Sequence, residues 1–300
     1  MKKGIINIDT IKIMIEVLEY EQHDTLYGVL DAISQLNFIF IDKVDKYISI
    51  NKTVKEHKIF YKGKQIAGVS TGRYRAAYDL RDIFYVSVSL YGLTQYHESD
   101  LGSLECLLQV CRYLNNRQII FRINEIDICY DIKCPFNNIL TLLNRKVPNV
   151  SYFEPDEAQG DKNIIRIENV PKIQYKKVNS RAYTYNKTAR NRWIKPDITR
   201  FELKLNSSFF KSNRKYMRAI KKSIDKYSIL YFDSTKVRNT VLNKYKEQWY
   251  SNKLDVNELK IDKYKLTLDM DYVEEFITML TTIDDVFTYD LVKPIRYRSN

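Results

Sequence analysis

The stretch "NEIDICYDI", residues Asn124–Ile132, alternates apolar and polar side chains. Side chains two residues apart share one face of a strand, so this alternation predicts a strand with one face in a core. The apolar face carries Ile126, Ile128, Tyr130 and Ile132. The opposite face carries Glu125, Asp127, Cys129 and Asp131. Three carboxylates on one face indicate either a sheet face exposed to water or a site for a hard cation such as Mg²⁺.

Similar strand-like runs fill the first two thirds of the chain. They are Ile5–Ile15, Phe38–Ile50, Asp82–Tyr91, Gln118–Ile132, a hairpin of Lys58–Tyr61 and Gln65–Val69 around "KGK", and three short strands between Asp161 and Asn206. Helical spacing predicts helices at Leu101–Leu114, Pro135–Arg145, Ser208–Tyr227, Val237–Trp249 and Tyr272–Thr282. Because strands and helices do not alternate regularly, we expect an α+β fold with a largely antiparallel sheet flanked by helices. We expect a first domain over residues 1–206 and a mostly helical, basic region over 207–300, for DNA contact or dimerisation.

The composition is that of a folded domain, with 44% hydrophobic and 29% charged residues in 300. We see no apolar run of about 18 residues, so we expect no membrane span. The N-terminal "MKKGIINIDT" does not resemble a signal peptide, because Asp9 interrupts its apolar run. The four cysteines have no zinc-binding spacing, and we expect reduced thiols in a cytoplasmic protein. Three scattered histidines do not support a histidine metal centre or base.

The net charge of +12 is concentrated in one block. Residues Lys172–Lys226 contain seventeen Lys and Arg against three acids, which gives +14 and leaves −2 for the rest of the chain. Such a concentrated excess is typical of proteins that bind a phosphate backbone. An anionic membrane surface or a merely solvated face is the alternative.

Within the block lies "SRAYTYNKTARN", Ser180–Asn191. As a strand, it places Arg181, Tyr183, Tyr185 and Lys187 on one face. This face is typical of a nucleic-acid stacking platform or of a nucleophile beside a charge partner, although a tyrosine-rich edge strand has the same pattern. The tyrosine pKa of about 10 makes the side chain a poor nucleophile near pH 7, unless a lysine or a metal favours the phenolate.

A further strand is predicted for "DITRFELKLN", Asp197–Asn206. Its apolar face carries Thr199, Phe201, Leu203 and Leu205, and its other face carries Ile198, Arg200, Glu202 and Lys204. Arg200 and Glu202 can simply form an ion pair on one face. Together, however, an acidic strand, a Tyr–Lys strand and a Glu-bearing strand supply the parts of a metal-dependent phosphoryl-transfer site.

Three of these motifs resemble the rolling-circle replication initiation factors, a family of plasmid Rep proteins with related conjugative relaxases and, more distantly, filamentous-phage nickases. The motifs are "IDICYDI", "YTYNKTAR" and "TRFELKL", which match in order and rough spacing. The N-terminal "IDTIKIMI", Ile8–Ile15, is also similar to the opening strand of that family. The resemblance covers roughly residues 5–210.

The resemblance implies an HUH-like sheet without the two-histidine motif, and a site-specific single-strand DNA endonuclease. In this family a tyrosine forms a 5′-phosphotyrosine link and leaves a 3′-hydroxyl that primes synthesis. Carried over, Tyr185 is the nucleophile with Tyr183 as its rival, and Lys187 is the motif lysine. The resemblance implies that Asp127, Asp131 and Glu202 bind the metal, Mg²⁺ or Mn²⁺. Glu125, on the same strand face as Asp127 and Asp131, is a further candidate ligand. The chain departs from the pattern at Thr188–Arg190, where relatives often have an acid.

The expected partners are origin or nick-site DNA, a second copy of the chain and a host helicase. The expected DNA-binding cations are Arg181, Arg190, Arg192, Arg200, Lys211, Arg214, Lys215, Arg218, Lys221 and Lys222. The last six lie on one side of a predicted helix. The alternative interpretation of this helix is a solvated surface helix that does not contact DNA. The alternative functions are an origin-binding initiator that does not cut and a relaxase of a conjugative element. A tyrosine recombinase is disfavoured because it needs several arginines and a histidine around the tyrosine.

Overall fold

The computed structural model describes two units, which the contacts of the chain divide as Met1–Asn7 with Asp127–Met279 (unit 1) and Ile8–Ile126 with Leu280–Asn300 (unit 2). The described residues are 5–37, 39–49, 52–75, 82–92, 101–143, 151–156, 161–168, 180–190, 197–206, 209, 222–225 and 227–250. Among them, ten strands form one sheet, in which β6 (Arg122–Ile132) is common to both units. Among the described helices, none is long and apolar enough to cross a membrane.

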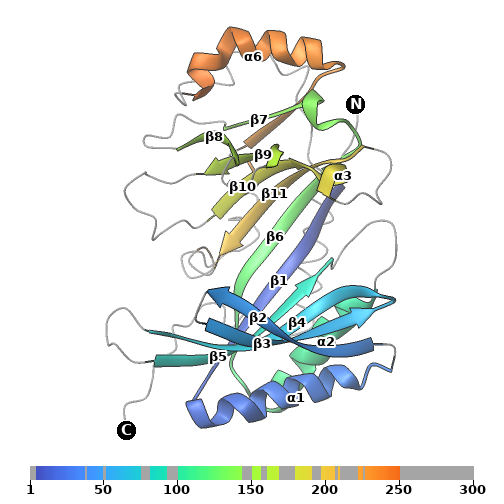
Figure 1. Ribbon diagram of the computed structural model, residues 1–300, viewed down its shortest axis with the longest axis vertical. Coiled ribbons are helices and arrows are strands. Elements are labelled where there is room, and N and C mark those ends of the chain that lie inside the picture. Colours follow the sequence, from blue (N-terminus) through green and yellow to red (C-terminus); the bar gives the residue numbers. More distant parts are fainter. Residues whose placement is uncertain are drawn as a thin grey trace. The chain divides into compact units, whose positions relative to one another are not determined.

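Unit 2 contains the strand order β2-β3-β4-β5-β1-β6 (Figure 1). The bounds are β1 Ile5–Val17, β2 Ile39–Ser49, β3 Lys52–Tyr61, β4 Lys64–Arg75 and β5 Asp82–Tyr91. Neighbours from β2 through β1 pair antiparallel, as in Ile13 opposite Val88. The β3–β4 hairpin turns at Lys62 and Gly63, both with positive φ, as the tight turn of such a hairpin requires.

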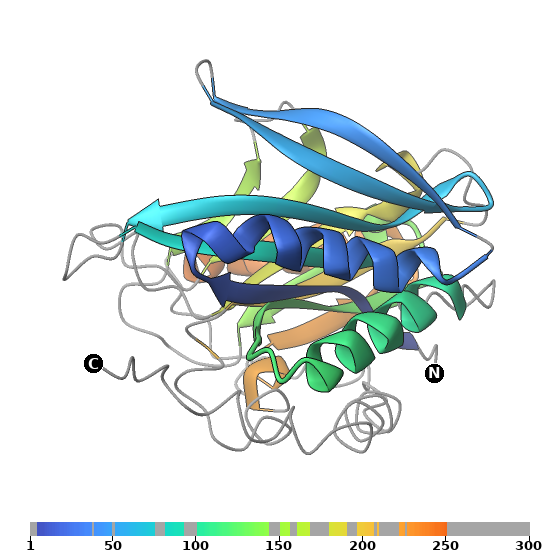
Figure 2. The ribbon, with the colours of Figure 1, turned by 90° about the horizontal axis from the view of Figure 1, so that it is seen from below.

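Two helices cover this part of the sheet. They are α1 (Gln22–Ser34), which follows the short 3₁₀ helix η1 (Glu19–Glu21), and α2 (Leu101–Asn116). Both contact β4 and β5, and Figure 2 shows them side by side. Apolar residues at helical spacing, such as Leu26, Val29 and Ile33 of α1, are buried against the strands. This burial of α1 and α2 makes the core of unit 2.

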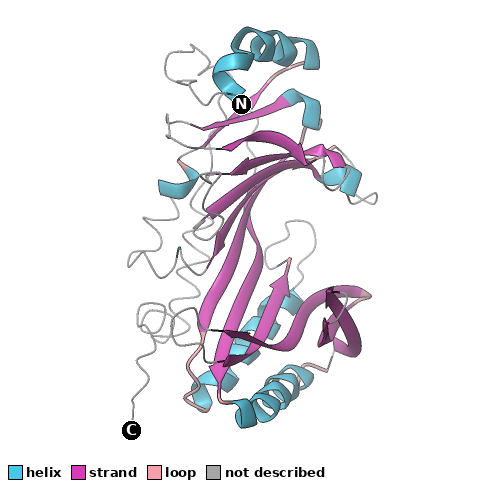
Figure 3. Cartoon of the chain, turned by 60° about the vertical axis from the view of Figure 1, so that its left-hand side comes forward, coloured by secondary structure: helices cyan, strands magenta, loops and turns pink. Residues whose placement is uncertain are grey.

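Unit 1 continues the strand order as β6-β11-β10-β9-β8. The bounds are β8 Ser151–Asp156, β9 Asp161–Glu168, β10 Ser180–Asn186 and β11 Thr199–Asn206, with the four-residue helix α3 (Lys187–Arg190) after β10. Antiparallel pairing joins β8 to β9, β9 to β10 and β10 to β11. Figure 3 shows how strongly strands predominate in the described chain.

A second, two-stranded sheet packs on one face of β10 and β11. It pairs β7 (Ile139–Leu143) with β12 (Tyr227–Tyr231) and is followed by helix α6 (Thr235–Tyr250). The Thr141 and Thr184 hydroxyls lie 2.9 Å apart in a buried hydrogen bond, and the Phe201 and Tyr227 ring centroids are 5.4 Å apart. This face of β11 is therefore core, and its charged residues lie on the other face.

The α+β fold with an antiparallel sheet and flanking helices is confirmed. The predicted helix Pro135–Arg145 is wrong, because this stretch forms the 3₁₀ turn η2 (Phe136–Asn138) and then β7. The helix predicted to reach Tyr227 ends earlier, since Tyr227 begins β12. The predicted helix Val237–Trp249 is confirmed as α6, whereas Tyr272–Thr282 lies outside the described residues. The division at residue 206 stays a prediction.

Candidate active site

The pairing of β10 with β11 brings the Tyr–Lys strand and the Glu-bearing strand together. Tyr183 lies opposite Glu202, and Tyr185 lies opposite Arg200. The core-facing residues of the two strands, such as Thr184 and Phe201, contact the β7–β12 sheet. Because side chains alternate along a strand, the tyrosines, Arg200 and Glu202 share the opposite face.

Tyr185 is held by a carboxylate on that face. Its hydroxyl donates a hydrogen bond of 2.9 Å to Glu202 Oε2, and only 8% of the residue is exposed. Burial, reinforced by the negative charge of Glu202, raises the pKa of Tyr185 above its ordinary value, while the Arg200 charge acts in the opposite direction. Tyr185 is therefore a protonated phenol whose proton already points at an acceptor. Tyr183 is half-buried on the same face.

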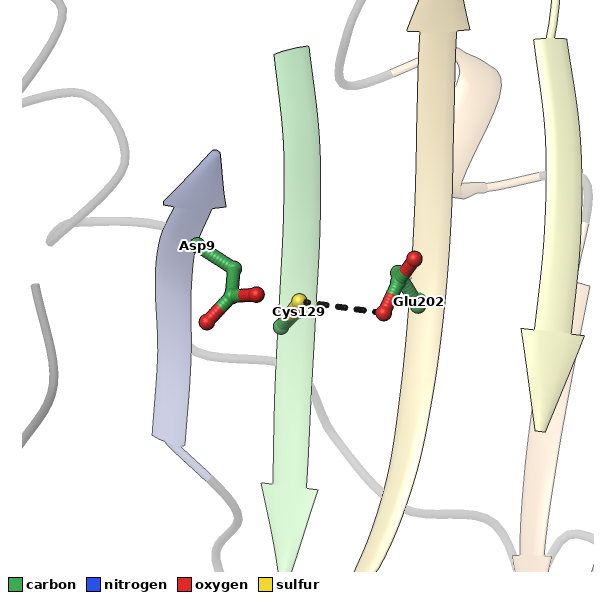
Figure 4. Close-up of side chains that lie close together, drawn as sticks. All are labelled: Asp9, Cys129 and Glu202. Carbon is green, nitrogen blue, oxygen red and sulfur yellow. Dashed lines mark hydrogen bonds between the residues drawn. The ribbon is translucent and has the colours of Figure 1, made fainter. Parts of the chain in front are cut away.

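Potential metal ligands gather at Glu202. The Cys129 thiol of β6 lies 3.9 Å from Glu202 Oε2 (Figure 4). Both residues belong to unit 1 and each offers one ligand atom, a sulfur and an oxygen. Carboxylates suit Mg²⁺ or Mn²⁺, whereas a thiol is a softer donor. This group of oxygen and sulfur donors can therefore hold a divalent ion.

Only Glu202 of the four predicted metal ligands belongs to this compact group. Asp127 instead lies 3.3 Å from the Lys204 ammonium, and Glu125 is half-buried on β6. Cys129 was not among the ligands predicted from the sequence. A signal was present, because Cys129 shares the acidic face of its strand.

Asp131 has a different environment from the one predicted. Arg200 donates from Nε to Asp131 Oδ1 at 2.7 Å and from Nη2 to Oδ2 at 2.8 Å, and Lys187 Nζ donates to Oδ2 at 2.9 Å. Burial alone acts to raise the pKa of Asp131, but the hydrogen bonds and charges of Arg200 and Lys187 outweigh it and lower the pKa. Both oxygens are engaged by cations, so we do not retain Asp131 as a metal ligand.

The prediction of Arg200 as a DNA contact also needs correction. Arg200 is 2% exposed, and its guanidinium is bound to Asp131, so it cannot lie on a DNA-binding surface in this arrangement. Lys222, in contrast, is exposed. The remaining predicted DNA-binding side chains lie outside those that the structure describes, namely Arg181, Arg190, Arg192, Lys211, Arg214, Lys215, Arg218 and Lys221.

The end of β10 is fixed by two hydrogen bonds to Ile198. The Lys187 amide donates to the Ile198 carbonyl at 2.9 Å, and the Ile198 amide donates to Thr188 Oγ1 at 2.8 Å. Thr188 therefore ties the start of α3 to the residues before β11. Its hydroxyl has a local structural partner, in the stretch Thr188–Arg190 where the family pattern predicts an acid.

Comparison with known proteins gives only weak similarity, to solved structures. No family model and no curated protein matches the sequence. Among solved structures, the chain is similar to a rolling circle replication initiator protein from Geobacillus stearothermophilus, with a TM-score of 0.36 and 11% identity over 76% of this chain and 86% of that chain. This similarity is too low to assign the family, so the function of the site has to be inferred from its own geometry.

Proposed function

We propose that the protein is a metal-dependent tyrosine nickase that cuts single-stranded DNA to initiate rolling-circle replication. The observation that carries this proposal is the hydrogen bond from Tyr185 to Glu202, on a sheet face that also presents potential metal ligands. The basic block of +14 supplies the charge that attracts a DNA strand. The resemblance of the three motifs to replication initiation factors supports the choice of DNA cleavage among phosphoryl-transfer reactions.

In the proposed reaction, the Tyr185 oxygen attacks the scissile phosphorus and its proton passes to Glu202. The bond between phosphorus and the 3′-oxygen breaks, and the departing oxygen takes a proton from water. The proton on Glu202 then neutralises the hydroxide that remains. The products are a 5′-phosphotyrosine and a free 3′-hydroxyl. A divalent ion held by Glu202 and Cys129 would polarise the phosphate and stabilise its developing charge.

A second candidate function is an initiator that binds origin DNA without cutting it. The burial of Tyr185 favours this alternative, because a nucleophile that is 8% exposed must become more accessible before it can reach a phosphate. The two candidates differ in whether a covalent adduct forms. Both candidates predict salt-sensitive binding of DNA, because both use the basic block.

The test is to incubate the full chain with single-stranded origin oligonucleotides or supercoiled plasmid, plus Mg²⁺ or Mn²⁺, and to detect a covalent adduct on denaturing gels. We expect wild type to form the adduct, EDTA to abolish it, and Tyr185→Phe to lose it. Tyr183→Phe is the matched control on the same strand face, and we expect it to retain the adduct. Full adduct yield from Tyr185→Phe would refute the nucleophile, while wild type that binds cognate DNA without any adduct supports the binding candidate.

A further inference from the structure

Three charged side chains form a buried cluster beside Tyr185, each from a different element. Asp131 lies on β6, Lys187 begins α3 and Arg200 lies on β11. The cluster is compact, because the two cations together donate three hydrogen bonds of 2.7–2.9 Å to one carboxylate. Both cations are nearly inaccessible, with Lys187 8% and Arg200 2% exposed.

The two cations of the cluster are neighbours of the proposed nucleophile, one along the chain and one on the adjacent strand. Lys187 follows Tyr185 by two residues, and Arg200 lies directly opposite Tyr185 on β11. The amide of Lys187 is also bound to the Ile198 carbonyl, two residues before Arg200. Asp131 therefore contacts one side chain that follows Tyr185 along the chain and one that lies opposite Tyr185 on β11.

The chemistry of this carboxylate excludes the usual catalytic roles. A carboxylate that accepts three charge-assisted hydrogen bonds is a poor proton acceptor. A metal ion at Asp131 would also compete with its hydrogen bonds to Lys187 and Arg200, two buried cations. Its remaining function is geometric, because planar Arg–carboxylate pairing fixes orientation as well as distance.

We propose that Asp131 is a positioning residue, which clamps Lys187 and Arg200 so that the Tyr185 hydroxyl is held at Glu202. This inference rests on the proposed nickase function. It replaces a role in metal binding for Asp131 and a role in DNA contact for Arg200. It makes Lys187 an arm of the clamp. Misplacement of a nucleophile by about 1 Å can cost about a hundredfold in rate, so the clamp matters for the chemical step.

The test measures single-turnover adduct formation against DNA and metal concentration for Asp131→Asn and Asp131→Glu. We expect Asp131→Asn to lower the rate roughly 10- to 100-fold, with the half-saturating concentrations of DNA and metal unchanged. Asp131→Glu keeps the charge, and we expect it to restore part of the rate. Lys187→Met removes one arm but leaves the Arg200 pair, so it reports on the clamp even if Asp131→Asn folds poorly. The Asp131→Asn/Lys187→Met double variant should lose less than the two single losses combined, because both changes act on one cluster.

Glu16→Gln is the matched control, because Glu16 is also a buried carboxylate bound to an arginine, with Arg122 Nη2 at 2.5 Å. We expect this change to weaken unit 2 without lowering the rate of adduct formation by the folded protein. A raised half-saturating metal concentration in Asp131→Asn would show a metal ligand and overturn the clamp. A rate for Asp131→Asn equal to that of Glu16→Gln would overturn it as well. If wild type forms no adduct, the nickase proposal itself fails, which is a separate result.

Discussion

The proton of Tyr185 is the residue-scale feature on which the proposed chemistry depends. The phenol cannot attack a phosphate until it loses this proton, and burial together with Glu202 makes its loss to water unfavourable. In the proposed reaction, Glu202 accepts this proton directly, through the hydrogen bond of 2.9 Å that the phenol donates to it. The same residue therefore disfavours a free phenolate and provides the route by which the phenol reacts.

Glu202→Gln keeps the size of the side chain but removes its capacity to take up the proton. We expect the rate of adduct formation to fall by at least about a hundredfold, which is typical of the loss of a general base. DNA binding, measured by fluorescence anisotropy without divalent ions, should change little. A variant that keeps the wild-type rate would contradict the role of Glu202. Glu125→Gln is the comparison variant. It makes the same chemical change at a carboxylate of β6, two residues before Asp127.

At the scale of elements, the β7–β12 sheet supports the site from behind. Its Tyr227 packs against Phe201 of β11, and Thr141 of β7 bonds to Thr184 of β10. Phe201 is the neighbour of both Arg200 and Glu202 along β11. The packing of this small sheet therefore fixes the strand that carries the clamp arginine and the proposed base.

Alkaline pH should weaken this packing through Tyr227, whose pKa is raised by burial. A tyrosine in the unfolded chain ionises near pH 10, whereas folded Tyr227 retains its proton to higher pH. The folded state then binds more protons than the unfolded state, so stability is full below pH 10 and falls as pH rises above it. In urea unfolding, we expect wild type to lose about 0.8 kcal/mol more than Tyr227→Phe between pH 8 and 10.5, because Tyr185, whose pKa is also raised, is present in both proteins. Equal losses in both proteins would contradict the prediction.

The elements also show which parts of the fold can be predicted from the sequence. Alternation alone identified β5 with its observed bounds, Asp82–Tyr91, because each of its residues follows a local pattern. It failed at "ILTLL", Ile139–Leu143, which has the leucines of a helix but becomes a strand through pairing with β12. That partner begins at Tyr227, far along the chain, so the local sequence of Ile139–Leu143 does not indicate the pairing.

The site was predictable to a similar extent. Alternation placed the acids of β6 and the charged residues of β11 on defined faces, but it does not give the register between two strands. The register decides that Asp131 meets Arg200, that Cys129 meets Glu202, and that Asp127 meets Lys204. Asp127 and Asp131, which look equivalent in the sequence as candidates for one metal site, thus differ in the structure by their partners across the sheet.

At the scale of the whole molecule, the separation of charge between the basic block and the rest of the chain predicts strongly salt-dependent DNA binding. Each phosphate contact to single-stranded DNA contributes about −0.7 to the slope of log K against log salt, so five contacts would give about −3.5. Only exposed cations can make such contacts. Arg200 is therefore excluded, although it belongs to the block, while Lys222 qualifies.

Lys222→Gln should make the slope about 0.7 less negative, because one phosphate contact is lost. Arg117→Gln is the matched control, since Arg117 is an exposed cation outside the block and should leave the slope unchanged. The measurement is anisotropy with a labelled oligonucleotide between 50 and 300 mM KCl, in EDTA, so that cutting does not interfere. Equal changes from the two substitutions would show that net charge alone drives binding. A reduced slope for Lys222→Gln alone would assign DNA contact to the basic block and keep it distinct from the buried cations that hold Tyr185.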